Sequence, residues 1–222
     1  MILFDSQTIL MFLMGTLETL YMTLVSTLFS YIIGLPLGML LILTDKKGMH
    51  PIAWLNSVIN VIVNFLRSIP FLILLVAIIP FTRTIVGTSI GSTATIVPLV
   101  VAAAPFVARL VEQSLQEVDG GVIEAAHSMG ASPLRILLKV MLPESMPSLL
   151  VGSAIACTTI LGYSAMAGFV GGGGLGKIAI NYGFYKYETE IMWITVILLV
   201  IVVQILQEIG MKIAKSSDKR NI

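Results

Sequence analysis

Residues 20–43 read LYMTLVSTLFSYIIGLPLGMLLIL, a run of 24 residues without a formal charge. A helix needs about 20 apolar residues to cross a hydrocarbon core of roughly 30 Å. Gly34 and Gly38 lie four residues apart within this run, and this spacing lets a second helix approach closely. The run therefore predicts a membrane-spanning helix that packs tightly against a neighbour.

The composition extends this prediction to the whole chain. Hydrophobic residues make up 57% of the 222 positions and charged residues 11%, with a mean hydropathy of +0.99, whereas soluble domains contain about 25% charged residues. We expect an all-α integral membrane protein that forms a single transmembrane domain over residues 1–222. Five transmembrane helices are predicted, at residues 17–43, 61–81, 90–108, 148–170 and 191–210.

The second of these helices is the hardest to predict. Arg67, Ser68 and Pro70 divide its apolar region into pieces, and a piece of about 11 residues makes only about 16 Å of helix. Because that length is too short to cross a bilayer, one long, kinked span is predicted over residues 61–81. An interfacial helix near Trp54 precedes it, and Pro70 causes the bend.

The distribution of Lys and Arg predicts the orientation. With five spans, nine of these residues fall on one side and three on the other, and the richer side is expected to be cytoplasmic. The N-terminus should then lie outside and the C-terminus in the cytoplasm. No Lys or Arg precedes Lys46, so a secretory signal is not expected. The nine are Lys46, Lys47, Arg109, Arg135, Lys139, Lys212, Lys215, Lys219 and Arg220; the three are Arg83, Lys177 and Lys186.

The region 111–142 is too polar to lie in lipid and should be a loop with structure of its own. Gly130 is typical of the left-handed residue that closes a helix. Ser132 and Pro133 are typical of the N-cap and the first position of a following helix. The pattern predicts a helix, a sharp turn and a second helix that continues to Pro143.

A small apolar strip lies beside the charges of this loop. Ala125, Ala126 and Met129 are expected on one side of the first helix, as in a short helix that lies in a groove on another protein. The alternative is an amphipathic segment that rests on lipid.

These loop residues also carry a resemblance to a known family. Glu124-Ala125-Ala126, Gly130 four residues later, and an aliphatic run that ends in Leu142-Pro143 resemble the cytoplasmic coupling loop of the permease subunits of ABC importers. The likeness covers nearly the whole chain, and the chain is similar to the methionine-importer permeases. Its further segments are Arg-Ser-Ile-Pro at 67–70, Ala-Pro-Phe-Val-Ala-Arg at 104–109, Gly-Tyr-Ser-Ala-Met at 162–166 and Gly-Gly-Gly-Gly-Leu-Gly at 171–176.

The resemblance implies a five-span subunit of the bacterial cytoplasmic membrane that works as a homodimer with two ATP-binding subunits. An extracytoplasmic, lipid-anchored binding protein would deliver methionine, which alternating access would move inward. The loop would couple the ATPase to the permease through Glu124, Ala125, Ala126, His127, Met129, Gly130 and Ala131, with support from Ser132, Pro133, Leu142 and Pro143.

No catalytic chemistry is predicted for the chain itself. Residues 171–177 spell G-x-x-x-x-G-K, but Ile178 stands where a phosphate-binding loop has Ser or Thr, so a mobile glycine-rich outer loop is expected instead. His50 and His127 lie in different loops and Cys157 lies in an apolar run, so neither a catalytic set nor a metal site is predicted. ATP and Mg are assigned to the partner subunit, and this chain should need no cofactor.

Polar residues within or beside the spans are candidates for the pathway or a gate. Asn56, Asn60 and Asn64 recur every four residues and form a polar stripe, which we interpret as a contact between helices, with the pathway as the alternative. An ion-driven amino-acid carrier or channel is the alternative function, but it would need acidic residues deep in the spans. A membrane-embedded enzyme would need a catalytic set there. The other pathway candidates are Arg67, Ser68, Pro70, Tyr163, Ser164 and Met166.

Overall fold

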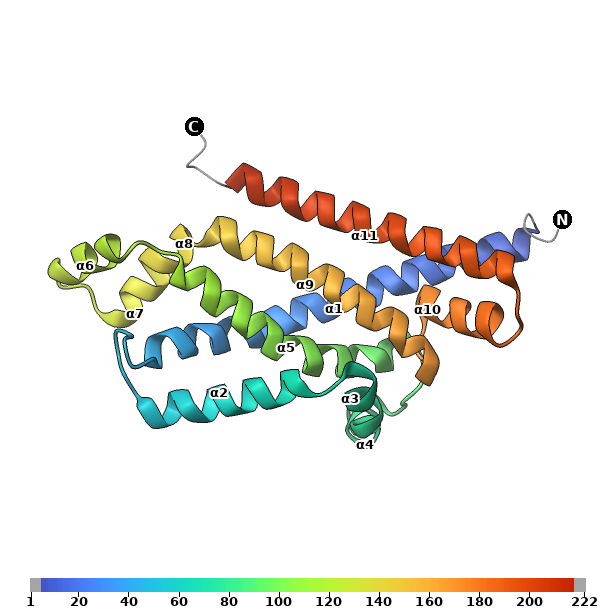
Figure 1. Cartoon of the computed structure of the whole chain (residues 1–222), viewed down its shortest axis with the longest axis horizontal. Coiled ribbons are helices and arrows are strands. Elements are labelled where there is room, and N and C mark those ends of the chain that lie inside the picture. Colours follow the sequence, from blue (N-terminus) through green and yellow to red (C-terminus); the bar gives the residue numbers. More distant parts are fainter. Residues whose placement is uncertain (1–4, 218–222) are drawn as a thin grey trace. The chain divides into compact units, whose positions relative to one another are not determined.

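Residues 5–217 are described by the computed structural model, and every element among them is helical (Figure 1). The prediction of an all-α protein is therefore confirmed. Lys219 and Arg220, which were counted in the cytoplasmic charge, lie outside the described residues. In chain order the helices are α1 (Ser6–Thr44), α2 (Ala53–Ser68), α3 (Phe71–Ala77), α4 (Ile79–Val86), α5 (Ser92–Gln116), α6 (Gly120–Ser128), α7 (Pro133–Ile136), η1 (Leu137–Met141), α8 (Leu142–Glu144), α9 (Met146–Met166), η2 (Ala167–Val170), α10 (Gly174–Ile178), η3 (Ala179–Phe184) and α11 (Thr189–Ser217).

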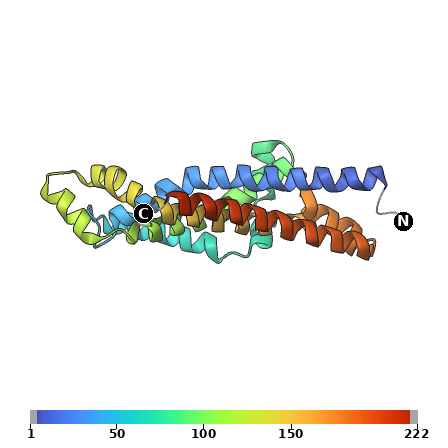
Figure 2. The ribbon, with the colours of Figure 1, turned by 90° about the horizontal axis from the view of Figure 1, so that it is seen from above.

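Four helical stretches are long and apolar enough to cross a membrane, namely α1, α5, the stretch Met146–Phe184 and α11. Figure 2 shows α1 and α11 as long helices without a break, and Pro36 lies inside α1 without interrupting it. A fifth crossing exists if α2 and α3 count as one bent span. The described residues therefore contain four or five candidate spans, against the five predicted.

The helix predicted over residues 61–81 is interrupted twice. α2 ends at Ser68, the chain bends by 102° at the break before α3, and a second break at Ile78 separates α3 from α4. Pro70 has φ −57° and ψ 134°, outside the helical region. A proline has no N–H for the helix and disfavours helical geometry in the residue before it, so Pro70 ends the helix where only a kink was predicted.

The described residues divide into two compact units. The first unit takes its residues from 5–29, 69–103 and 157–208, and the second from 30–68, 104–156 and 209–217. The four long helices α1, α5, α9 and α11 each contribute residues to both units.

In the second unit, α5 packs on α1 where α1 carries two glycines. A Cβ atom built at Gly34 would lie 2.8 Å from the carbonyl oxygen of Ala104, and one at Gly38 would lie 2.6 Å from that of Ala108. The two helix backbones are therefore in contact, as the glycine spacing predicts. The core of this unit consists of Val107, Val111, Leu115, Val118, Ile136, Leu137, Met141, Leu149 and Ala156.

We expect Gly38→Leu to destabilise this contact. The obstructing atom is a backbone oxygen, which cannot move aside as a flexible side chain can, and overpacking of this kind costs about 1–3 kcal/mol. The melting temperature of the detergent-solubilised protein should fall by several degrees. Gly162→Leu is the matched control, because a Cβ at Gly162 meets nothing within 4 Å; equal melting temperatures for the two variants would contradict the close packing.

The glycine-rich segment, predicted as a mobile loop, is a packed part of the first unit. Its residues 172–176 are all buried. The Glu18 carboxylate accepts hydrogen bonds from the Gly174 N–H at 2.7 Å and from the Ser92 hydroxyl at 2.9 Å. The Thr19 hydroxyl accepts one from the Leu175 N–H at 2.9 Å. Side chains of α1 therefore hold this segment through its backbone. A Cβ atom at Gly174 would lie 2.5 Å from the Thr19 hydroxyl oxygen, so the close approach of α1 requires glycine at this position.

Candidate functional site

α6 and α7 form the helical hairpin that the sequence predicts within residues 111–142 (Figure 1). Gly130 adopts φ +79°, the left-handed conformation that glycine takes most cheaply. The Gly130 N–H donates to the His127 carbonyl at 2.9 Å, and the Ala131 N–H donates to the Ala126 carbonyl at 3.2 Å. These two bonds make the Schellman closure of a helix, so the predicted sharp turn is confirmed.

The ends of the two hairpin helices differ from the prediction in their side-chain caps. Ser132 and Pro133 stand at the N-cap and first position of α7, as predicted, but the Ser132 hydroxyl makes no capping hydrogen bond. The cap that is made belongs to α6, where the Asp119 carboxylate accepts a bond from the Gly121 N–H at 2.8 Å. Asp119 was missed, although an Asp before a helix is a recognised N-cap signal.

The second hairpin helix continues beyond Pro143, its predicted end, to Glu144. A π-helical turn at Leu137–Met141 comes immediately before. A π-helical turn can accommodate a residue that disturbs the regular hydrogen-bond pattern of an α-helix. Pro143 is such a residue, because proline has no N–H.

One side of the hairpin packs on the core of the second unit and the other side is exposed. Ile123, Ala126 and Ala131 pack against that core, so Ala126 does not belong to the exposed strip in which it was predicted. Glu124, Ala125 and His127 are exposed. The large exposed apolar residues are Val122 (44%), Met129 (87%), Leu134 (58%) and Leu138 (41%).

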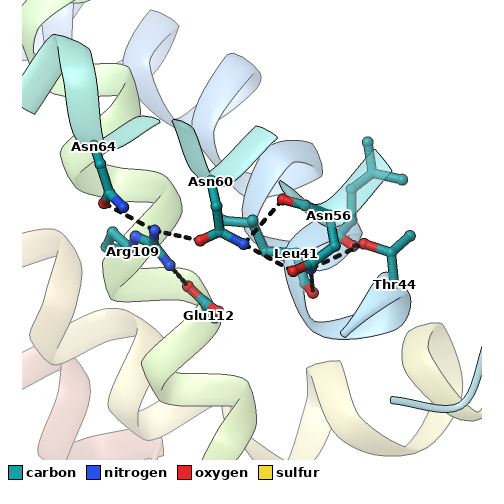
Figure 3. Close-up of polar contacts among 8 residues, drawn as sticks. Leu41, Thr44, Asn56, Asn60, Asn64, Arg109 and Glu112 are labelled. Atoms are coloured by element: carbon teal, nitrogen blue, oxygen red, sulfur yellow. Dashed lines mark hydrogen bonds and ion pairs between the residues drawn. The ribbon is translucent and has the colours of Figure 1, made fainter. Parts of the chain in front are cut away.

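The asparagine stripe of α2 faces α1 and α5 (Figure 3). The Asn56 amide donates to the Leu41 carbonyl at 2.8 Å and to the Thr44 hydroxyl at 3.1 Å, both in the last turn of α1. The Asn60 amide donates to the Asn56 carbonyl at 2.9 Å and to the Asn56 side-chain oxygen at 2.8 Å. The stripe is therefore a contact between helices, as interpreted from the sequence.

Arg109 of α5 completes this network (Figure 3). Its Nη2 donates to the side-chain oxygens of Asn60 and Asn64, the latter at 2.9 Å, and its Nη1 makes a 2.6 Å ion pair with Glu112. The side chains of Arg109 and Glu112 are only 18% and 12% exposed. We call Asn56, Asn60, Asn64, Arg109 and Glu112 the polar ladder. Arg109 was predicted to contribute to the cytoplasmic charge and to the resemblance at 104–109, but no contact with the asparagine stripe was predicted for it. Its isolation between apolar residues was the available signal.

The pathway candidates of the second unit lie in the last turn of α2. Arg67 and Ser68 are exposed, and the Ser68 hydroxyl donates to the Asn64 carbonyl at 2.8 Å. Within residues 5–217, Arg67 makes no hydrogen bond or ion pair. A pathway role for either residue stays a prediction.

The pathway candidates of the first unit lie near the end of α9. The Tyr163 ring stacks on Phe71, with 4.7 Å between ring centroids. Ser164 is buried, and its hydroxyl donates to the Leu161 carbonyl of the same helix at 2.8 Å. Met166 is 45% exposed. Among the described residues no group of three or more His, Cys, Asp or Glu side chains could hold a metal ion.

These features define a helical integral membrane protein with a structured hydrophilic hairpin between two of its long helices, α5 and α9. The family described as the binding-protein-dependent transport system inner membrane component matches residues 34–213. The chain belongs to this family. The prediction of an importer permease from the loop residues is thereby confirmed, and it is favoured over the ion-driven carrier or channel.

Relatives and a solved structure resemble this chain over almost its full length. The probable D-methionine transport system permease protein MetI of Vibrio cholerae is 50% identical, covering 94% of this chain and 92% of that protein. The methionine import system permease protein MetP of Bacillus subtilis is 47% identical, covering 93% of each. An inward-facing structure of the MetNI methionine ABC transporter matches with a TM-score of 0.95 and 47% identity, covering 97% of this chain and 100% of that one.

Proposed function

We propose that this chain is the permease subunit of a bacterial methionine importer and that it moves methionine inward by alternating access driven by a separate ATPase. The observation that carries the coupling part of this proposal is the exposed side of the hairpin, where Met129 is 87% exposed at the tip of a rigidly closed turn. The substrate is proposed from the relatives, which are methionine permeases of about this length.

The hairpin fits a partner protein better than it fits lipid. Its exposed apolar side chains alternate with Glu124, His127 and Arg135, a mixture that suits a short helix in a groove on another protein. The other side of α6 is fixed to the core of the second unit. We therefore expect a force applied to α6 to reach the core of the second unit through Ile123 and Ala126.

The direct connection to α5 makes this transmission short. α5 ends at Gln116 and α6 begins at Gly120, and Val118 between them is buried in the core of the second unit. ATP shifts the transporter only if the ATPase dimer binds one conformation of the permease better than the other. Displacement of α6 by that dimer is then carried into α5.

The proposed assembly contains two copies of this chain, two ATP-binding subunits that hold ATP and Mg, and an extracytoplasmic, lipid-anchored binding protein. The hairpin and the C-terminus lie in the cytoplasm and the N-terminus lies outside. This arrangement requires five spans, and the chain has five when α2 and α3 count as one bent crossing. The positive charges then gather on the cytoplasmic side.

Uptake by the reconstituted complex tests the proposal. Proteoliposomes that contain this chain and its ATPase, supplied with the binding protein, should accumulate radiolabelled methionine only when ATP is present on the ATPase side. L- and D-methionine are assayed separately, with leucine as a competitor of similar size. Uptake that follows an ion gradient without ATP would contradict the proposal and would favour the carrier or channel.

A further inference from the structure

α2 is held in the second unit by polar contacts more than by apolar burial. Val63 is the buried residue of this helix, whereas Trp54, Val61 and Phe65 are 71%, 67% and 65% exposed. In a membrane, apolar contact between helices gains little over contact with lipid. The position of α2 against α1 and α5 therefore depends on the polar ladder.

At one end of the polar ladder, the ion pair of Arg109 lies wholly within α5 and does not depend on α2. Glu112 lies three residues after Arg109 on the same helix, and the two form an ion pair. If α2 moves away, Arg109 loses the two amide oxygens of Asn60 and Asn64, but its charge stays paired. Glu112 therefore holds the guanidinium in place on α5, so Asn60 and Asn64 bind a group whose position is set by α5.

The contact of Arg109 with α2 lies where movement of α5 would shift Arg67 and Ser68, two of the candidate pathway or gate residues. Arg109 is on the helix that leads into the hairpin, and Asn64 is in the last two turns of α2. The Ser68 hydroxyl donates to the Asn64 carbonyl, and Arg67 lies beside it in the same turn. The guanidinium group therefore joins the helix that receives the force to the helix end that carries Arg67 and Ser68.

We propose that Arg109 is a positioning residue for transport, which ties the last turns of α2 to α5 and makes α2 follow the displacement that the hairpin gives to α5. Arg109 acts through Asn60 and Asn64 and does not touch the substrate. This inference rests on the proposed function of the chain as an importer permease.

The test compares two substitutions on α2 in the full complex with its ATPase and binding protein, reconstituted in proteoliposomes. Asn64→Leu removes one acceptor of Arg109 with little change of size. Ser57→Leu is the control, because Ser57 is exposed on the same helix and takes no part in the polar ladder. The readout is the ratio of methionine transported to ATP hydrolysed, which a loss of folded protein alone would not change.

For Asn64→Leu we expect this ratio to fall about tenfold, within the range by which residues between coupled sites alter coupling, while ATP hydrolysis and assembly are retained. Ser57→Leu should keep the wild-type ratio. Arg109→Gln should lower the ratio as well, and adding Asn64→Leu to it should produce little further loss, since contacting residues are not additive.

Two results would overturn the role of Arg109. One is an unchanged ratio in Asn64→Leu, which includes a parallel fall of uptake and hydrolysis that follows the amount of assembled complex. The other is full additivity of the two substitutions. If the wild-type complex shows no ATP-dependent uptake, the proposed function itself fails; if the wild type transports and Asn64→Leu keeps its ratio, only the role of Arg109 fails.

Discussion

Replacing Gly130 with valine is expected to reduce ATP-dependent uptake at least tenfold while the chain still accumulates in the membrane. Gly130 has φ +79°, where a β-branched residue is a genuine outlier. The strain, about 1–2 kcal/mol or more, falls on the two hydrogen bonds that close α6. The hairpin then no longer presents Met129 in a fixed direction.

The effect on uptake should come from coupling and not from folding. A Cβ at Gly130 meets nothing within 4 Å, so the core of the second unit is undisturbed. Gly120→Ala is the matched control, because Gly120 begins the same helix and has equally open surroundings. Glu124→Ala should also uncouple uptake from ATP hydrolysis without loss of expression. Unchanged ATP-dependent uptake in both the Gly130 and Glu124 variants would contradict the role of the hairpin.

Gly176→Ala is expected to prevent normal accumulation of the protein. The added methyl group would lie 2.3 Å from the Ala165 carbonyl oxygen and 2.7 Å from the Ala165 Cα. Both atoms belong to the backbone of α9, so relief requires movement of a helix, and we expect a loss of about 3 kcal/mol or more.

Membrane-fraction yield and melting temperature in detergent measure this loss. Gly162→Ala, in the open part of α9, should keep the wild-type yield. A Gly176→Ala protein with wild-type yield and melting temperature would show that the glycine-rich segment is not packed as described.

The features that the sequence predicts well have local causes. The charge-free run around Gly34 and Gly38 is sufficient to predict both a long helix and a close neighbour, because length and small residues act on the helix that contains them. The turn at Gly130 is likewise predicted from a few adjacent residues, since the Schellman closure involves only the end of one helix.

The features that the sequence does not predict depend on distant partners. A run of glycines resembles a flexible loop until its partner is known, and that partner, Glu18, lies 156 residues from Gly174. Arg109 similarly finds Asn60 49 residues earlier in the chain. A run of apolar residues shows how long a span can be, but it does not show in which direction the helix axis runs. The sharp bend at Pro70 was therefore expected only as a kink.

The docking of the hairpin on a cytoplasmic ATPase is tested most directly at Met129, which is 87% exposed. Cys157 is the only cysteine in the chain, so Met129→Cys in a Cys157→Ser background places a single thiol on the hairpin. In inside-out vesicles that contain the complete complex, a photo-crosslinker attached there should join this chain to the ATP-binding subunit. In separate inside-out vesicles that contain this chain without its ATPase, a membrane-impermeant maleimide should label the free thiol. Labelling of the thiol in intact cells, or the absence of any crosslink to an ATP-binding subunit, would contradict the docking.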